Sequence, residues 1–241
     1  MRTNSDIDSV TAEIKETALK FGADLVGIVP AHTIDSLPKV WVGWKIQEYT
    51  EKTVDIMPDA NSVIVMGYHV WDDMFELAIR KGEEWVYPGY FLLDVLIVAL
   101  RSFLEKKGYK TACASSISHK RLAQLAGFGN YGKNALIINP IYGPWLRFAA
   151  VVTNAELTPD KPFTQDLCKD CEECVKACPG NALTPYKVDD QKCLLGIHLM
   201  NQAGFEQNQK WTKIEPLLSK NSHRMCTVCQ RVCRYGREKH S

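Results

Sequence analysis

Apolar residues recur along the chain in patterns that predict both helices and strands. Residues 6–21 place five apolar side chains at helical spacing after Ser5, a residue type that caps helices, so we expect an amphipathic helix there. The stretches 23–30 and 62–70 are dense in β-branched residues and predict two short buried strands. The chain therefore opens with a helix that can cover a sheet.

A long apolar segment in the middle of the chain predicts a central helix. Residues 88–107 begin with proline, carry apolar side chains on nearly every side and are followed by Gly108, which is a helix-stop signal. The other expected elements are a helix at 118–126 and strands at 109–115, 134–139 and 145–153. Helices and strands do not alternate as in βαβ units, so the pattern predicts an α+β fold.

The composition changes after Leu157. The sequence TPDKPF brings two prolines, and a cysteine-rich segment follows it. We therefore expect two domains, residues 1–157 and residues 158–241.

The charge balance excludes a global electrostatic role. Lys and Arg number 29 against 28 Asp and Glu, a formal net charge of +1, so no overall field attracts nucleic acid or an anionic membrane. The first 21 residues mix acids with bases and contain no continuous apolar core, which does not resemble a secretory signal. The longest apolar run, Tyr90–Leu100, is interrupted by Asp94 and is shorter than the roughly 18 residues that span a bilayer. We expect a cytoplasmic protein without a membrane partner.

Cysteine spacing is the strongest chemical signal. Eight of the nine cysteines lie between Cys168 and Cys233. Cysteines 168, 171, 174 and 178 precede Pro179 and form C-x2-C-x2-C-x3-C-P, the bacterial ferredoxin run for [4Fe-4S] clusters. In that run three thiolates bind one cluster and the fourth binds a second cluster, so a second run is expected.

The second run supplies the remaining thiolates. Cys226, Cys229 and Cys233 form C-x2-C-x3-C, and Cys193 lies between the two runs. Crossed ligation then predicts one cluster on Cys168, Cys171, Cys174 and Cys233, and another on Cys178, Cys193, Cys226 and Cys229. Arg234 stands where ferredoxins usually have proline, which affects the local turn. C-x2-C pairs also bind structural zinc, and this remains the alternative.

Two neighbouring clusters form a short path for electrons. A path of this kind needs an acceptor at its end, and residues 1–157 are too many for a ferredoxin alone. We therefore expect the N-terminal domain to hold a redox cofactor or the terminal acceptor.

A glycine cluster, AGFGNYGKNALIINP, raises a separate question. Gly127, Gly132 and Lys133 match G-x4-G-K by letter, and Gly127, Gly129 and Gly132 match G-x-G-x-x-G. A phosphate loop needs a preceding strand and a Ser or Thr after the lysine, whereas here a helix is expected before it and Asn134 follows. The alternatives are a helix C-cap at Gly127 with a tight turn, or a wall where the backbone approaches a large ligand.

The stretch LAQLAGFGNYGKNALIINPIYGPWLRFAAVVTNAEL, followed by the two cysteine runs with one intermediate cysteine, resembles the epoxyqueuosine reductase family and, more distantly, the corrinoid reductive dehalogenases. ADLVGIVPA and SVIVMGY are also similar to early strands of that family. The resemblance implies a nitroreductase-like, cobalamin-binding α+β domain followed by a ferredoxin-like double [4Fe-4S] domain. It further implies base-off cobalamin beside the nearer cluster, reduced to Co(I) by the clusters. Cobalamin contacts are then expected from Gly127, Gly129, Gly132, Lys133 and Asn134.

The chain departs from this family in two respects. Fourteen residues before the first glycine, where the family has a general-acid aspartate, the chain has Cys113. A thiol is a different acid, so His119 and Tyr68 are further candidate proton donors beside Cys113. The sequence also ends soon after Cys233, without the helical repeats that grip tRNA in that family, and we expect no tRNA partner.

These features support a cobalamin-dependent and [4Fe-4S]-dependent oxidoreductase that reductively cleaves a small organic substrate and takes electrons from a donor such as ferredoxin or flavodoxin. One alternative is an electron-transfer protein that reduces or carries a corrinoid for a partner protein and has no organic substrate. Another is a flavin in the same cavity.

Overall fold

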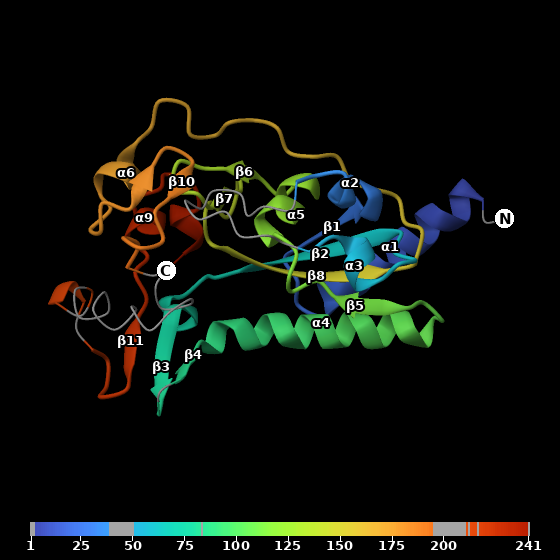
Figure 1. Ribbon diagram of the computed structural model, residues 1–241, viewed down its shortest axis with the longest axis horizontal. Coiled ribbons are helices and arrows are strands. Elements are labelled where there is room, and N and C mark those ends of the chain that lie inside the picture. The colour runs from blue at the N-terminus through green and yellow to red at the C-terminus, as the bar shows by residue number, and fades with distance from the viewer. Residues whose placement is uncertain are drawn as a thin grey trace.

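The fold is built on a four-stranded antiparallel sheet in the order β1-β2-β8-β5 (Figure 1). The computed structural model describes residues 3–38, 51–82, 84–194, 211, 213–215 and 217–240. The strands of this sheet are β1 (Leu25–Pro30), β2 (Ser62–His69), β8 (Leu146–Thr153) and β5 (Thr111–Cys113). Helices are packed against an antiparallel sheet, so the predicted α+β class is confirmed.

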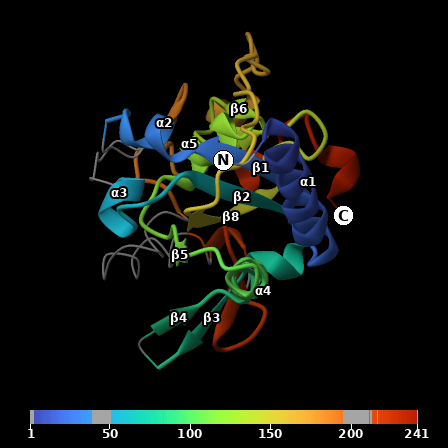
Figure 2. The same cartoon turned by 90° about the vertical axis from the view of Figure 1, so that its right-hand side faces the viewer.

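Helices cover both faces of this sheet. Helices α1 (Asn4–Lys20) and α4 (Pro88–Lys106) lie on one face and α5 (His119–Leu125) lies on the other (Figures 1 and 2). Side chains alternate along β2, so Ile64 and Met66 join the core under α4 while Val63 and Val65 join the core under α5. This double burial explains why the central strands are continuously apolar.

Helix α1 begins earlier than the sequence pattern predicts. Thr3, and not Ser5, is the N-cap residue. The Asp6 amide donates to Thr3 Oγ1 at 3.2 Å and the Thr3 amide donates to Asp6 Oδ2 at 2.9 Å, which is a reciprocal capping box. The predicted Ser5 cap is therefore wrong, because the helix starts at Asn4 and Ser5 lies within its first turn.

The predicted C-cap at Gly127 is confirmed. Gly127 has a φ of 82° and donates its amide to Gln124 O at 3.1 Å, while the Phe128 amide donates to Ala123 O at 2.9 Å. These two bonds are the Schellman pattern that closes a helix. The chain then forms a small hairpin of β6 (Asn130–Tyr131) and β7 (Ile137–Ile138), so the strand expected at 134–139 is only two residues long.

Several short elements are visible only in the structure. They are α2 (Ala31–Asp35), α3 (Thr53–Ile56), η1 (Asp73–Glu76), β3 (Leu77–Lys81), β4 (Glu84–Val86), α6 (Glu173–Lys176), β9 (Leu183–Thr184), β10 (Lys187–Val188), β11 (Ser222–Arg224), α9 (Val228–Arg231) and η2 (Arg237–Lys239). Among the described residues, no helix is both long and apolar enough to cross a membrane.

The cysteine-rich part interlocks with the N-terminal part. Strand β11 pairs with β3, and β3 pairs with β4, so a sheet of three strands combines residues from both sides of the expected boundary at 158. Asp160, just after that boundary, accepts the Ile28 amide at 2.7 Å and pairs with Lys15. The two-domain division remains a prediction, and in the structure the two parts share an extensive contact.

The C-terminal residues 235–240 pack against the turn at 139–145. The His240 ring stacks on Trp145 with centroids 3.4 Å apart, and its nitrogens lie 2.8 Å from Val70 O and 3.0 Å from Asp73 Oδ1. Gly143 and Gly236 let the two backbones meet, because a Cβ on Gly143 would lie 2.1 Å from Tyr235 O.

We expect Gly143→Ala to destabilise the protein more than Gly108→Ala does. Both glycines have positive φ, so each substitution carries a left-handed backbone cost of about 1–2 kcal/mol. A Cβ on Gly108 meets nothing within 4 Å, whereas one on Gly143 meets the clasped backbone and adds about 1–3 kcal/mol. Thermal unfolding of the two variants measures the difference, and equal losses would show that this close approach is not needed.

Candidate functional site

The first group of thiols lies near the protein surface. Cys174 is influenced electrostatically by Cys168, Cys171 and Cys233, and Cys233 by Cys168 and Cys171. These four residues come from both cysteine runs and meet where α6 contacts α9. All eight thiols of the two groups are half-buried. Burial raises the pKa of Cys174 less than it raises those of Cys226 and Cys229 in the second group, so the first group lies closer to solvent.

The second group lies deeper. Cys226 is influenced by Cys193 and Cys178, and Cys229 by Cys193, Cys226 and Cys178. Cys229 is also influenced, more weakly, by Cys174 of the first group, so the two groups adjoin. The structure thus brings the seven cysteines of the two runs and Cys193 into two neighbouring groups of four. The assignment of each thiolate to a particular cluster remains a prediction.

Burial keeps several of the metal-free thiols protonated, among them Cys174, Cys226 and Cys229. It raises the pKa of Cys174 to about 11 and that of Cys226 to about 12, and it holds the pKa of Cys229 well above its ordinary value. Iron binds thiolates, so cluster assembly at these residues has to displace protons. Loading with iron and sulfide therefore becomes easier as the pH rises.

Lys133 and Asn134 tie the N-terminal half to both thiol groups. The Lys133 amide donates to Cys168 Sγ at 3.4 Å, and Lys133 Nζ lies 3.5 Å from Glu172. Asn134 Nδ2 donates to Cys229 O at 3.4 Å, and Asn134 Oδ1 accepts the Leu136 amide at 3.1 Å. Hydrogen bonds to cluster sulfurs adjust reduction potentials, so this turn is placed to influence the first cluster.

The three expected glycine contacts lie elsewhere. A Cβ on Gly129 would lie 2.2 Å from Ile138 O, one on Gly132 would lie 2.5 Å from the Ile138 side chain, and one on Gly127 would lie 2.8 Å from Lys161 O. These glycines admit neighbouring backbone and side chains of the protein itself, and none of the three lines the cavity described next. The glycines that match the nucleotide-binding motifs by letter are therefore needed for a tight hairpin of the chain itself.

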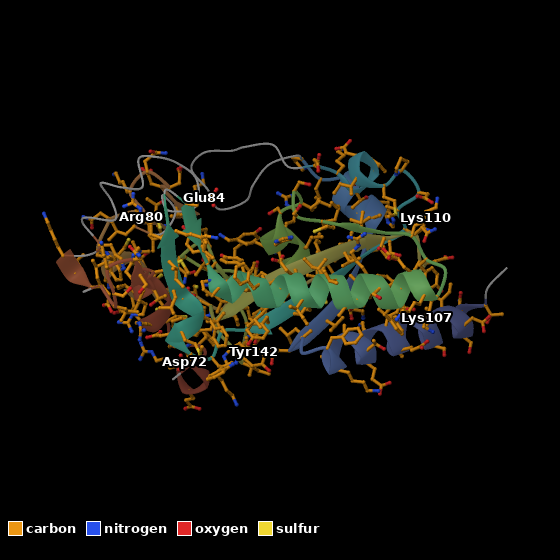
Figure 3. All side chains as sticks on the ribbon, turned by 90° about the horizontal axis from the view of Figure 1, so that it is seen from below. Asp72, Arg80, Glu84, Lys107, Lys110 and Tyr142 are labelled. Carbon is orange, nitrogen blue, oxygen red and sulfur yellow. The ribbon has the colours of Figure 1, made fainter. Side chains whose placement is uncertain are left out.

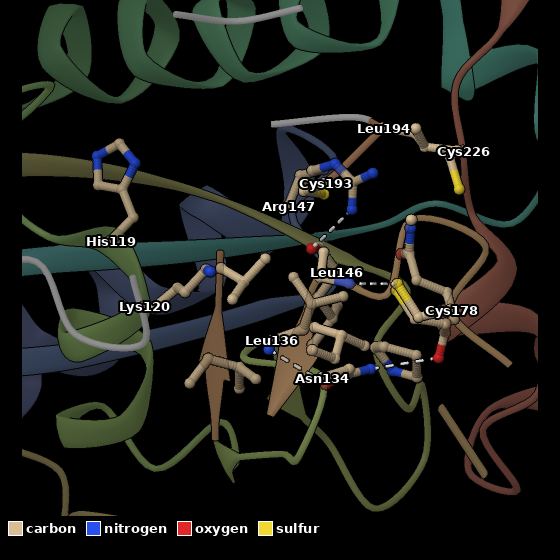
Figure 4. Close-up of a pocket in the computed structure, with 18 of the residues that line it drawn as sticks. His119, Lys120, Asn134, Leu136, Leu146, Arg147, Cys178, Cys193, Leu194 and Cys226 are labelled. Atoms are coloured by element: carbon tan, nitrogen blue, oxygen red, sulfur yellow. Dashed lines mark hydrogen bonds between the residues drawn. The ribbon is translucent and has the colours of Figure 1, made fainter. Parts of the chain in front are cut away.

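A cavity of about 260 Å³ lies between the second thiol group and the N-terminal sheet. Its walls include all four thiols of that group together with Asn134, and most of its lining is apolar. Figure 4 shows His119 and Lys120 on one side, with Cys178, Cys193 and Cys226 on the other. Among the described residues that line it, none is an aspartate or glutamate. Asn134 is the one predicted cofactor contact that the structure places on this cavity.

His119 also lines the cavity, but its proton is engaged. His119 Nε2 lies 3.1 Å from Ala114 O, and a carbonyl can only accept, so this nitrogen carries the hydrogen. Burial lowers the pKa of His119 below its usual value, although the Ala114 carbonyl opposes this effect. The ring is therefore neutral near pH 7 and is better suited to accept a hydrogen bond than to deliver a proton.

Two cations of the cavity wall were not foreseen from the sequence. Lys120 Nζ donates to Ala135 O at 2.7 Å, and burial lowers the Lys120 pKa to about 8 even though Cys193 and Cys229 oppose this. Arg147 forms a buried ion pair with Glu76. Burial alone would lower the Arg147 pKa, but the Glu76 carboxylate outweighs it and raises that pKa. The sequence did not predict that Lys120 and Arg147 line a cavity, because charged residues on helices and strands usually face solvent.

The other two candidate proton donors point to the α4 face of the sheet, away from helix α5. Cys113 pairs with Val151, and Tyr68 is on the same face of β2 as Met66. Val151 and Met66 belong to the core under α4, so strand alternation directs Cys113 and Tyr68 to that face. Tyr68 packs on Phe75 with centroids 5.8 Å apart. Neither residue lines the cavity, which differs from the expectation.

Comparison with known families supports the assignment of the cysteine-rich part. Residues 167–236 match the family described as "4Fe-4S double cluster binding domain". This part of the chain is therefore a double [4Fe-4S] domain.

Relatives extend the similarity over most of the chain. An epoxyqueuosine reductase of Bacillus subtilis is 28% identical over 247 residues, which cover 92% of this chain and 62% of the relative. One of Listeria monocytogenes is 36% identical over 122 residues, which cover 50% of this chain and 30% of the relative. The chain thus spans only part of the length of these relatives.

Solved structures show the same fold. A selenomethionine-labelled epoxyqueuosine reductase aligns with a TM-score of 0.72 at 23% identity, over 97% of this chain and 67% of that one. A catabolic reductive dehalogenase with 3-bromo-4-hydroxybenzoic acid aligns with a TM-score of 0.67 at 20% identity, over 99% and 33%. A third structure, described as suggesting a mechanism for B12-dependent dehalogenation, aligns with a TM-score of 0.59 at 21% identity, over 80% of this chain and 30% of that one. The resemblance expected from the sequence is confirmed.

We expect Cys193→Ala to remove about half of the bound iron, because it takes one of four ligands from the deeper cluster only. Cys113→Ala is the matched control, since Cys113 lies outside both thiol groups and should leave the iron content unchanged. Iron and sulfide analysis of the anaerobically reconstituted proteins measures both. Full iron content in the Cys193 variant, or loss in the Cys113 variant, would contradict this ligand assignment.

Proposed function

We propose that the chain is a corrinoid-dependent iron–sulfur reductase that passes electrons through two [4Fe-4S] clusters to cobalamin for the reductive cleavage of a small organic substrate. The cavity carries this proposal, because its walls combine the second thiol group with residues of the N-terminal sheet and helix α5. A redox cofactor held there would lie next to the deeper cluster. The first cluster, nearer the surface, would receive electrons from a donor such as ferredoxin or flavodoxin.

The cavity wall is chemically suited to the rim of a corrinoid. Most of the lining is apolar, as expected for a flat macrocycle. Gln230 is 2% exposed, and its Oε1 has no hydrogen-bond partner among the described residues, so it can accept a bond from an amide of the corrinoid. Asn134 adds a second amide to the wall. The cavity volume of about 260 Å³ can hold the edge of the corrin ring that is nearest the cluster. We propose that the remainder of the corrinoid lies outside this cavity.

When bound, the corrinoid would supply a reducible cobalt centre able to attack or reduce a carbon–heteroatom bond. The residues of the chain would exclude water, supply charge and deliver a proton. The leucines and valine of the wall, Leu136, Leu146, Leu183 and Val188, exclude water from the space beside the deeper cluster.

Lys120 is the best-placed proton donor of the cavity. It lines the cavity, unlike Cys113 and Tyr68, and its ammonium group is held in place by donation to Ala135 O. A pKa of about 8 leaves most Lys120 side chains charged at pH 7 and makes proton release easier than from an exposed lysine. We propose that Lys120 donates the proton that reductive cleavage consumes.

Similarity to relatives that act on tRNA does not identify the substrate of this chain. One solved epoxyqueuosine reductase contains an epoxyqueuosine-modified tRNA stem loop, and this chain covers 67% of that one. The expectation of a small molecule instead of tRNA remains a proposal.

The proposed cofactor can be tested with the reconstituted protein. Cobalamin added in the absence of oxygen should shift its absorption to that of the base-off form. A chemical reductant should then reduce the cobalt to Co(I), with each cluster passing on more than one electron. Release of an organic product from candidate substrates would establish a reductase, whereas cobalt reduction without product would favour the corrinoid carrier. An unchanged corrinoid spectrum would contradict both, and a yellow chromophore would favour the flavin alternative.

Lys120→Gln should lower the reduction potential of the deeper cluster. Reduction adds negative charge to the cluster, and the nearby cation stabilises that reduced state. Lys120→Arg retains the charge and should keep the potential near that of the unmodified protein. Potentiometric titration followed by EPR measures both variants, and equal potentials in all three proteins would exclude this electrostatic role.

A further inference from the structure

Helix α4 presents an apolar stripe to solvent. Phe91, Val95 and Val98 are 56%, 61% and 65% exposed, and their spacing of four and three residues places them on one line along the helix. The buried leucines of the same helix, Leu93, Leu96, Leu100 and Leu104, lie on the opposite side, against the sheet. Contiguous exposed apolar side chains of this kind mark interaction surfaces in soluble proteins.

This stripe lies on an open side of the molecule. Figure 3 shows α4 in front of the sheet when the protein is seen from below, with its length exposed to the viewer. Strands β3 and β4 project past the level of α4 near its N-terminal end (Figures 1 and 2). The stripe therefore lies in a recess that strands β3 and β4 border at the N-terminal end of α4.

The charges beside the stripe are self-complementary. Asp94 and Arg101 lie on the same flank of the stripe, at nearly equal distances before and after Val98. Asp94 forms no ion pair with any residue that the structure describes. Arg101 Nη2 binds Glu105 at 3.3 Å and Arg101 Nε binds Thr111 Oγ1 at 3.0 Å, which fixes the guanidinium group on that flank.

We propose that a second copy of this chain docks on α4, with the two helices antiparallel and a twofold axis near Val98. A twofold axis perpendicular to the plane of the two helices keeps corresponding flanks together. It places Asp94 of each copy beside Arg101 of the other, Val98 against Val98, and Val95 of each copy near Ser102 of the other. Such an isologous contact covers Val95 and Val98 and gives Asp94 a cationic partner, while Arg101 keeps its bonds to Glu105 and Thr111 within its own chain.

The helix face alone is smaller than a standard interface, which buries roughly 800 Å² on each partner. In the antiparallel arrangement the projecting strands β3 and β4 of each copy extend toward the C-terminal half of the partner's α4, and this adds contact area. The dimer is therefore expected to dissociate on dilution. This inference does not depend on the proposed redox chemistry.

The first test is the mass of the full-length, cluster-loaded protein by sedimentation velocity over a concentration series. We expect a reversible monomer–dimer equilibrium. Val98→Glu brings two like charges together at the axis and should weaken dimerisation by more than about tenfold, whereas Val98→Ile keeps the apolar contact and should retain it. Val98 is exposed, so circular dichroism and iron content should be unchanged in both variants.

A charge exchange then tests the register. Asp94→Arg and Arg101→Asp should each weaken the dimer, and the double variant should recover it. The two residues are seven positions apart, about 10.5 Å along the helix, so they do not pair within one chain and recovery reports contact between copies. A protein that stays monomeric at its highest soluble concentration, a dimer insensitive to Val98→Glu, or a double variant no better than the single variants would overturn the proposed interface.

Discussion

The two thiol groups depend on a turn of the N-terminal half that contacts both of them. The Lys133 amide donates to Cys168 of the first group, and Asn134 donates to the carbonyl of Cys229 in the second. The glycines around this turn allow it to lie close to Ile138 and Lys161, so the turn is held rigidly by its own hairpin. The arrangement fixes the cluster domain against the sheet, and the cavity beside Cys193 and Cys229 is the space that remains between them. The chemistry proposed for that cavity follows from this docking.

Burial of charge is the main energetic demand of the arrangement. Four thiolates beside Lys120 and the Arg147–Glu76 pair would be costly in an apolar cavity unless iron neutralised them. Without iron, burial holds Cys226 and Cys229 protonated, so folding of this region and cluster assembly are coupled. The clasp of His240 on Trp145 and the β11–β3 pairing hold the cysteine-rich part to the sheet by contacts that do not involve iron.

Much of the fold could be predicted from the sequence, because strong local patterns determine it. The runs at 62–70 and 145–153 are buried on both sides and therefore apolar at most positions. The eight clustered cysteines have spacings that few structures other than two cubanes require. The C-cap at Gly127 was predictable because it needs a left-handed residue after a helix. Strands β3, β4 and β11 were not, because they are short and β11 pairs with β3 across about 145 positions of sequence.

The site was predicted less completely. The family resemblance predicted cofactor contacts from the glycines and Lys133, whereas in the structure the glycines form a tight hairpin and the Lys133 amide contacts Cys168. Cys113 and Tyr68 do not line the cavity. Lys120 was overlooked because a charged residue on a short helix usually faces solvent. The central claim is that a corrinoid and the deeper cluster share this cavity, and magnetic coupling measures that directly. EPR of the protein holding Co(II) cobalamin and the reduced deeper cluster should show spin–spin splitting, whereas a simple sum of the two separate spectra would contradict the account.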